Sequence, residues 1–155
     1  MLHAKALRCV LICAVVFGAA HCHFARAQTS AKSNAAEAER WTDKDEWLSW
    51  DFRVVRPGEY DVLVVTSEQK YGRDWEGGHE LLVETAGQSL RGKVERDGKE
   101  VDPANPYWPD VISTLGRLRV DKAGRYGITL KPQTLRSDKK LGLTLVSVRL
   151  VPVGS

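Results

Sequence analysis

The sequence predicts an all-β protein, an antiparallel β-sandwich, and three observations support this prediction. Short apolar runs recur after residue 40, and several of them alternate between apolar and polar positions, as half-buried strands do. Pro, Gly and Asp residues separate these runs at short intervals. No segment after residue 40 keeps a helical period, so the crossover helices that a parallel sheet needs are not expected.

The first 27 residues have the pattern of a secretory signal peptide. Lys5 and Arg8 precede an apolar run over 9–20, which is shorter than the roughly 20 residues of a membrane-spanning helix. Residues 25–27 (Ala-Arg-Ala) then give the small-x-small pattern of a cleavage site. A lipoprotein signal centred on Cys22 is the alternative, but a His precedes that Cys where a small residue is required. We therefore expect a secreted or periplasmic protein.

Removal of this leader changes the charge and the cysteine content. It contains three of the 23 basic residues and none of the 20 acidic ones, so 20 of each sign remain. Because phosphate binding needs an excess of basic residues, a nucleic-acid partner is not expected. The leader also contains all three cysteines, so the exported chain has no disulfide and no thiolate ligand. We expect no membrane contact after cleavage.

The exported chain keeps one histidine, His79, and this limits the enzyme chemistry that it can support. We expect a surface or loop role for His79. We also expect no enzyme activity and no cofactor, with a hydrolase as the remaining alternative. Asp43 and Asp45 resemble the start of a calcium loop but lack its later Gly and Glu, so no metal ligands are assigned. Asp74 and Glu76 could form the carboxylate pair of a glycosidase, but no other catalytic signature accompanies them.

Residues 28–40 form a polar linker without large apolar side chains, and the β-sandwich domain covers 41–155. A first strand over 48–54 alternates in period two and places Trp50 and Phe52 in the core. Tyr60 is also a core residue, in a central strand that is apolar on both faces. The further strands are expected at 60–66, 80–85, 90–94, 99–101, 111–114, 115–120, 126–131 and 143–153.

Two local features concern how these strands connect. Asp97-Gly98 is a strong two-residue hairpin signal, which predicts that 90–94 pairs with 99–101. In the last strand, Leu143 and Leu145 share one phase, whereas Val146 and Val148 share the other. This change of phase predicts a β-bulge near Leu145, or a strand buried on both faces. Residues 133–142 are expected to be a polar loop.

Several segments, taken in order, resemble a known family. They are DEWLSWDF at 45–52, RPGEYDV at 56–62, LRGKV at 90–94, LGRLRV at 115–120, AGRYGITL at 123–130 and the leucine-rich strand at 141–152. In order and spacing they resemble the accessory β-sandwich of some bacterial secreted alpha-L-fucosidases and sulfatases. They are also similar to family 6 and family 35 carbohydrate-binding modules. The resemblance covers about residues 41–153.

This resemblance implies a jelly-roll, galactose-binding-like sandwich that binds carbohydrate without catalysing a reaction. The chain departs from the family in two places. No extra strand is recognised within 28–40, where those modules usually begin with one or two. A longer Pro-rich insert replaces a Thr-Gly-x-Trp-like turn, and Trp108 is its only counterpart for the Trp.

Two long polar loops, 67–78 and 102–110, contain the candidate ligand-binding residues. Aromatic rings in such loops can stack on the apolar faces of sugars, while neighbouring polar groups bind the hydroxyls. The predicted site consists of Tyr71, Arg73, Asp74, Trp75, Asn105, Tyr107 and Trp108. The alternative is that Trp75 and Trp108 fold back as lids over the end of the sandwich. The expected partner is a polysaccharide or another glycan, and the alternative is another exported protein.

Overall fold

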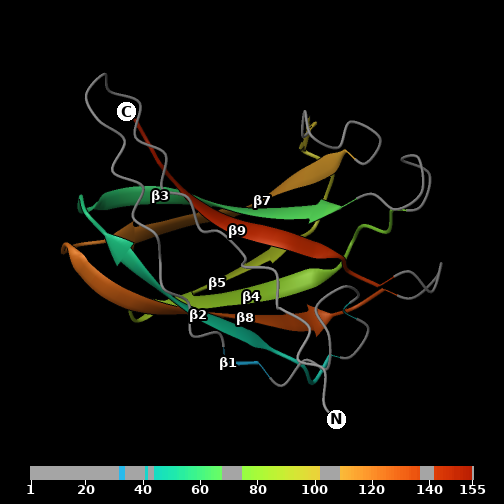
Figure 1. Cartoon of the computed structure of the whole chain (residues 1–155), viewed down its shortest axis with the longest axis horizontal. Coiled ribbons are helices and arrows are strands. Elements are labelled where there is room, and N and C mark those ends of the chain that lie inside the picture. Colours follow the sequence, from blue (N-terminus) through green and yellow to red (C-terminus); the bar gives the residue numbers. More distant parts are fainter. Residues whose placement is uncertain are drawn as a thin grey trace, which may run out of the picture.

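The computed structural model describes residues 32–33, 41, 44–67, 75–101, 109–136 and 142–154. Within these residues it is an antiparallel β-sandwich without helices, as predicted (Figure 1). One sheet has the strand order β1-β2-β8-β4-β5 and consists of β1 (Lys32–Ser33), β2 (Leu48–Val54), β8 (Gly124–Thr134), β4 (Glu80–Thr85) and β5 (Gln88–Lys93). The other has the order β6-β7-β3-β9 and consists of β6 (Gly98–Glu100), β7 (Asp110–Val120), β3 (Gly58–Ser67) and β9 (Leu145–Pro152).

The core lies between the two sheets and follows from the alternation of side chains along the strands. Trp50, Phe52 and Tyr60 are all buried in it, which confirms their assignment. β3 is a central strand whose inward residues include Val62 and Val64. Val65 has the opposite phase and is also fully buried, but on the same outer face Glu59 is exposed and Asp61 and Leu63 are half-buried. The outer face of β3 is therefore covered only in part, and not along the whole strand as its composition predicts.

Two bulges adjust the register of the four-stranded sheet. The pairing of β3 with β9 shifts at Val146, which confirms the bulge expected near Leu145. The pairing of β3 with β7 shifts at Leu115, beside Gly116 with a φ of 139°. This second bulge joins the expected strands 111–114 and 115–120 into the single strand β7 and changes which phase faces the core.

The hairpin expected at Asp97-Gly98 is wrong. β5 and β6 belong to different sheets, and β6 pairs with β7 instead. The buried Val94 explains the difference, because its backbone bonds to Gly78 and His79 and so carries the chain across to the second sheet. Asp97 then accepts a hydrogen bond from the Thr114 N–H through its carboxylate, at 2.6 Å, and does not serve as a hairpin turn.

Two smaller differences concern segments that were expected to lack strands. Lys32 and Ser33 pair with Ser49 and Leu48, so the stretch 28–40 contributes a two-residue strand to the sheet edge. β8 continues to Thr134, two residues into the segment 133–142 that was expected to be a loop. In both cases backbone pairing with a neighbouring strand outweighs a polar local sequence.

Candidate functional site

The sandwich has two ends with different connections (Figure 1). At one end, called the loop end here, β3, β6 and β8 finish and β4, β7 and β9 begin. At the opposite end, called the turn end, lie the short connections 55–57, 86–87 and 121–123. Both predicted ligand loops belong to the loop end.

The strand register brings the bases of the two predicted loops together. Ser67, the last residue of β3, is paired with Asp110, the first residue of β7. Asp110 is also paired with Glu100, the last residue of β6. Adjacent strands lie about 4.8 Å apart. The loop after β3 therefore starts one strand away from the point where the loop between β6 and β7 ends.

Trp75 is the one predicted ligand residue within the described part of the chain. Its indole Nε1 donates a hydrogen bond to Thr66 Oγ1 at 2.9 Å, and its ring packs against the core while remaining partly exposed. The Arg96 guanidinium lies 4.9 Å from the ring centroid, which is a cation–π distance. A sugar that stacks on the ring face covered by Arg96 must displace the Arg96 guanidinium. The other contacts of Trp75 make it a lid over the core between the sheets.

Gly77 lets the chain pass closely over this lid. A Cβ at position 77 would lie 2.5 Å from two ring carbons of Trp75, which is closer than non-bonded carbon atoms approach each other. The glycine pair at 77–78 therefore follows from the packing of the indole, and Gly78 adds a left-handed φ of 81°.

The surface role expected for His79 is wrong, although it does lie in a loop, just before β4. Its side chain is fully buried and shares the inward phase of Leu81 and Val83. His79 Nδ1 accepts a hydrogen bond from the Arg136 N–H at 3.0 Å, so the proton of the neutral ring is on Nε2. This hydrogen bond links the residue before β4 to the segment that follows β8.

Burial lowers the pKa of His79, because the charged ring loses its solvation inside the protein. The Glu76 carboxylate and the backbone carbonyls of Glu76 and Gly142 act in the opposite direction, whereas Arg136 adds to the lowering. Nε2 is buried and makes no hydrogen bond of normal geometry. A buried neutral imidazole in this setting supports the structure and is not positioned to act on a bound ligand.

Glu76 and Asp74, the carboxylate pair weighed above, are not both described. Glu76 is buried beside His79, and Asp74 lies outside the described residues. The other predicted ligand residues also lie outside them, namely Tyr71, Arg73, Asn105, Tyr107 and Trp108. Their assignment to the site stays a prediction.

Metal-binding clusters and membrane-spanning helices are both absent from the described residues. No group of three or more His, Cys, Asp or Glu residues there could hold a metal ion. No helix there is long and apolar enough to cross a membrane.

Sequence reasoning missed the residues that fix the loop end, but two of them left a signal. His79 has the same parity as Leu81 and Val83, so extending the strand pattern backwards by one position would have placed it inside. Thr66 closes an otherwise apolar strand on its inward phase, where a polar group needs a partner. Arg96 left no signal, because its contact with Trp75 depends on the crossover between the sheets.

Comparison with known proteins gives a likeness to a solved structure. No protein-family model matches the chain, and a search of curated proteins finds no match. Among solved structures, the chain is similar to an alpha-L-fucosidase from Vibrio sp. strain EJY3, with a TM-score of 0.61 and 21% sequence identity. The match covers 72% of this chain and only 21% of the fucosidase chain. The likeness shows that the fold recurs as a part of that larger chain.

Proposed function

We propose that the protein is an exported, non-catalytic β-sandwich that binds carbohydrate at its loop end. The observation that supports the proposal most directly is the pairing of Ser67 with Asp110, which places the bases of the two aromatic loops side by side. The likeness to a part of an alpha-L-fucosidase agrees with this role, since accessory modules accompany such enzymes. Fucose-bearing glycans are therefore the first ligands to examine.

The mechanism is aromatic stacking combined with hydrogen bonds from polar loop residues. In this proposal Trp108 is the main stacking residue, and Tyr107 and Tyr71 contribute further aromatic rings. Trp75 is held at the base of the site by its hydrogen bond to Thr66, and a sugar can stack on its ring only after it displaces Arg96. Arg73, Asp74 and Asn105 bind sugar hydroxyls. Stacking of one ring on an aromatic side chain contributes on the order of 1 kcal/mol, so binding is weak for a single sugar and grows along a polymer.

Affinity electrophoresis in gels that contain neutral polysaccharides tests this proposal. We expect the exported chain, 28–155, to be retarded by at least one fucose- or galactose-bearing polymer, and Trp108→Ala to lower its affinity about tenfold. Trp75→Phe keeps a ring on the core and is expected to have a smaller effect. Absence of retardation in every gel, or unchanged retardation in Trp108→Ala, would disprove the site.

A matched control uses Trp47, which is partly exposed and precedes β2. Trp47→Ala removes a tryptophan from the start of the domain, outside the sequence of either aromatic loop. We expect it to be retarded like the wild type. Arg96→Gln is a second control, because loss of the cation above Trp75 should leave sugar binding unchanged or stronger if the sugar displaces this guanidinium.

A further inference from the structure

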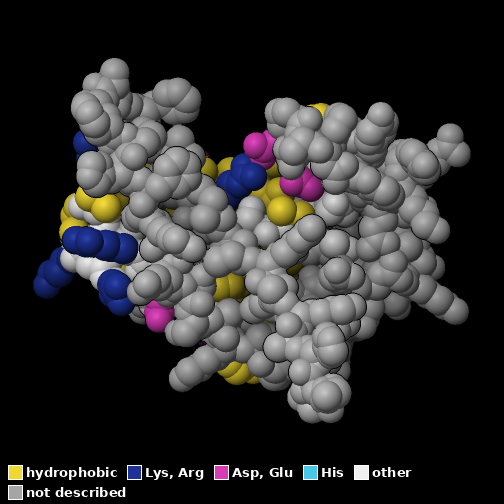
Figure 2. Space-filling view, in the orientation of Figure 1, with side chains coloured by type: hydrophobic (Ala, Val, Ile, Leu, Met, Phe, Trp, Pro, Cys, Tyr) yellow, Lys and Arg dark blue, Asp and Glu magenta, His cyan; other side chains and the backbone are white. Residues whose placement is uncertain are grey.

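The turn end carries a group of cations that have no carboxylate partner among the residues that the structure describes. Arg53, Arg56, Lys122 and Arg125 are all exposed, and none of them forms an ion pair with another described residue. They belong to the ends of β2 and β8 and to the two connections 55–57 and 121–123. Figure 2 shows dark blue side chains gathered at this end of the molecule, beside apolar ones.

The strand register makes this arrangement of like charges unfavourable in free energy unless an anionic partner neutralises it. Arg53 and Arg125 are directly opposite each other in the pairing of β2 with β8. Their side chains leave the same outer face of the sheet, with Cβ atoms roughly 5 Å apart, where like charges repel. The neighbouring pair on that face, Asp51 and Gly127, brings a single carboxylate, and it is not bonded to either arginine.

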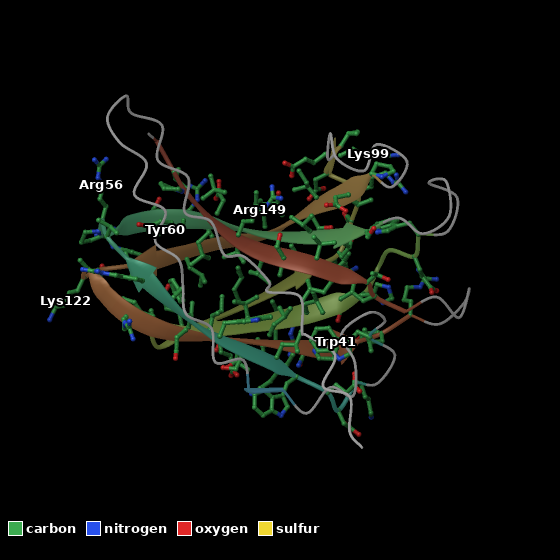
Figure 3. The ribbon with its side chains drawn as sticks, viewed as in Figure 1. Trp41, Arg56, Tyr60, Lys99, Lys122 and Arg149 are labelled. Carbon is green, nitrogen blue, oxygen red and sulfur yellow. The ribbon has the colours of Figure 1, made fainter. Side chains whose placement is uncertain are left out.

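The other acidic residues near this end are already engaged. Asp121 accepts from Arg119 at 2.8 Å, and Glu59 lies 3.6 Å from Arg117. They therefore neutralise cations on the other sheet. Arg56 and Lys122 extend from the two adjacent turns away from the body of the protein (Figure 3). The free cations thus surround the edge of the turn end and do not close over a pocket.

We propose that the turn end binds an acidic polysaccharide through these four cations. Guanidinium groups bind carboxylate and sulfate groups in a bidentate manner, and two arginines on one strand pair can hold neighbouring anionic groups of one polymer. An open group of exposed cations suits an extended polymer better than a small anion. The exported chain has equal numbers of basic and acidic residues, so its affinity for a polyanion is expected to depend on a local group of cations such as this one and not on the net charge.

This surface is separate from the loop end, and the two proposals can fail independently. The test is affinity electrophoresis of the chain 28–155 in dextran sulfate, in polygalacturonate and in uncharged dextran. We expect retardation in the two acidic polymers only, and a steep loss of it between about 20 mM and about 150 mM salt. The variant Arg53→Gln/Arg125→Gln is expected to bind at least about tenfold more weakly.

A matched control removes two cations elsewhere on the same sheet. Arg91→Gln/Lys93→Gln changes the net charge equally but lies on β5, and it is expected to keep its affinity. Trp75→Phe should also keep it, which separates this surface from the loop-end site. An acidic polymer should raise the melting temperature of the wild type and not that of the Arg53/Arg125 variant.

Three results would overturn the proposal. They are equal losses in the two double variants, the absence of retardation in both acidic polymers, and binding to phosphatidylglycerol vesicles with none to the polysaccharides. The Arg53/Arg125 variant itself is expected to fold, since its melting temperature should equal or exceed that of the wild type once the like charges are gone.

Discussion

At the scale of single residues, His79 contributes most to the loop end. It joins three segments that lie far apart in the sequence, through the Arg136 N–H, through its own carbonyl to Val94, and through its place at the start of β4. The ring must be neutral for this arrangement, because a proton on Nδ1 would face the Arg136 donor. Its role is therefore coupled to pH.

We expect the stability of the protein to fall as the pH decreases below the unfolded-state pKa of about 6.5. The folded-state pKa of His79 is lowered by burial, so in this range the unfolded chain binds more protons than the folded one. The loss is at most about 1.4 kcal/mol per pH unit for one group. Urea unfolding at about pH 7.5 and about pH 5.5 measures it, while most carboxylates stay ionised.

The control for this prediction is His79→Gln, which keeps a polar side chain of similar size. It is expected to be less stable than the wild type at neutral pH but to lose less stability between the two pH values. An equal loss in both proteins would show that His79 is not the group that titrates.

The sequence predicts residues well where their role depends on alternation. Trp50, Phe52 and Tyr60 are in the core as expected, because period-two burial is a local property of a strand. His79 was misjudged because it precedes the strand and is polar, and a polar residue is usually at the surface. Trp75 could be assigned to a loop, but its contacts with Thr66 and Arg96 depend on tertiary packing.

At the scale of elements, the close approach of β5 to β7 determines how the two sheets meet. A Cβ at Gly92 would lie 2.5 Å from the Leu115 carbonyl oxygen and 2.7 Å from its Cα, both backbone atoms. A Cβ at Gly116, at the bulge in β7, would lie 2.8 Å from Cδ1 of Leu90, which is a side-chain atom. Only glycine permits the backbones of the two sheets to approach this closely.

We therefore expect Gly92→Ala to destabilise the protein by about 3 kcal/mol, because the backbone of β7 would have to move. Gly98→Ala is the matched control, since its added Cβ would lie 3.7 Å from Ile112 in ordinary contact. That change should cost less than about 1 kcal/mol. Chemical unfolding of both variants gives the comparison, and equal stabilities would contradict the packing described here.

Local signals predict the existence of strands better than their partners. The strands around Leu48, Leu81 and Ile128 are found where alternation indicates them. The Asp97-Gly98 signal is equally strong, yet its strand pairs in the other sheet. A turn motif reflects only the local backbone preference. The sheet to which β6 belongs depends instead on where the preceding Val94 is buried.

At the scale of the whole molecule, the two ends have separate proposed roles. The loop end gathers the bases of the aromatic loops and is stabilised by Trp75 and His79. The turn end presents unpaired cations around the Arg53 and Arg125 pair. A sandwich that spans 21% of a fucosidase chain shows that the fold occurs alongside other parts of a larger chain. Two ligand surfaces at opposite ends would let such a domain bind a neutral and an acidic polymer independently of each other.

The most direct test of the central claim is a backbone amide NMR titration of the chain 28–155 with oligosaccharides of the neutral polymer that retards it most. The account predicts shifts that cluster at the loop end, around Ser67, Trp75 and Asp110 and in the two aromatic loops. The turns 55–57 and 86–87 should be unaffected. Shifts confined to the turn end, or none with any neutral glycan, would contradict it.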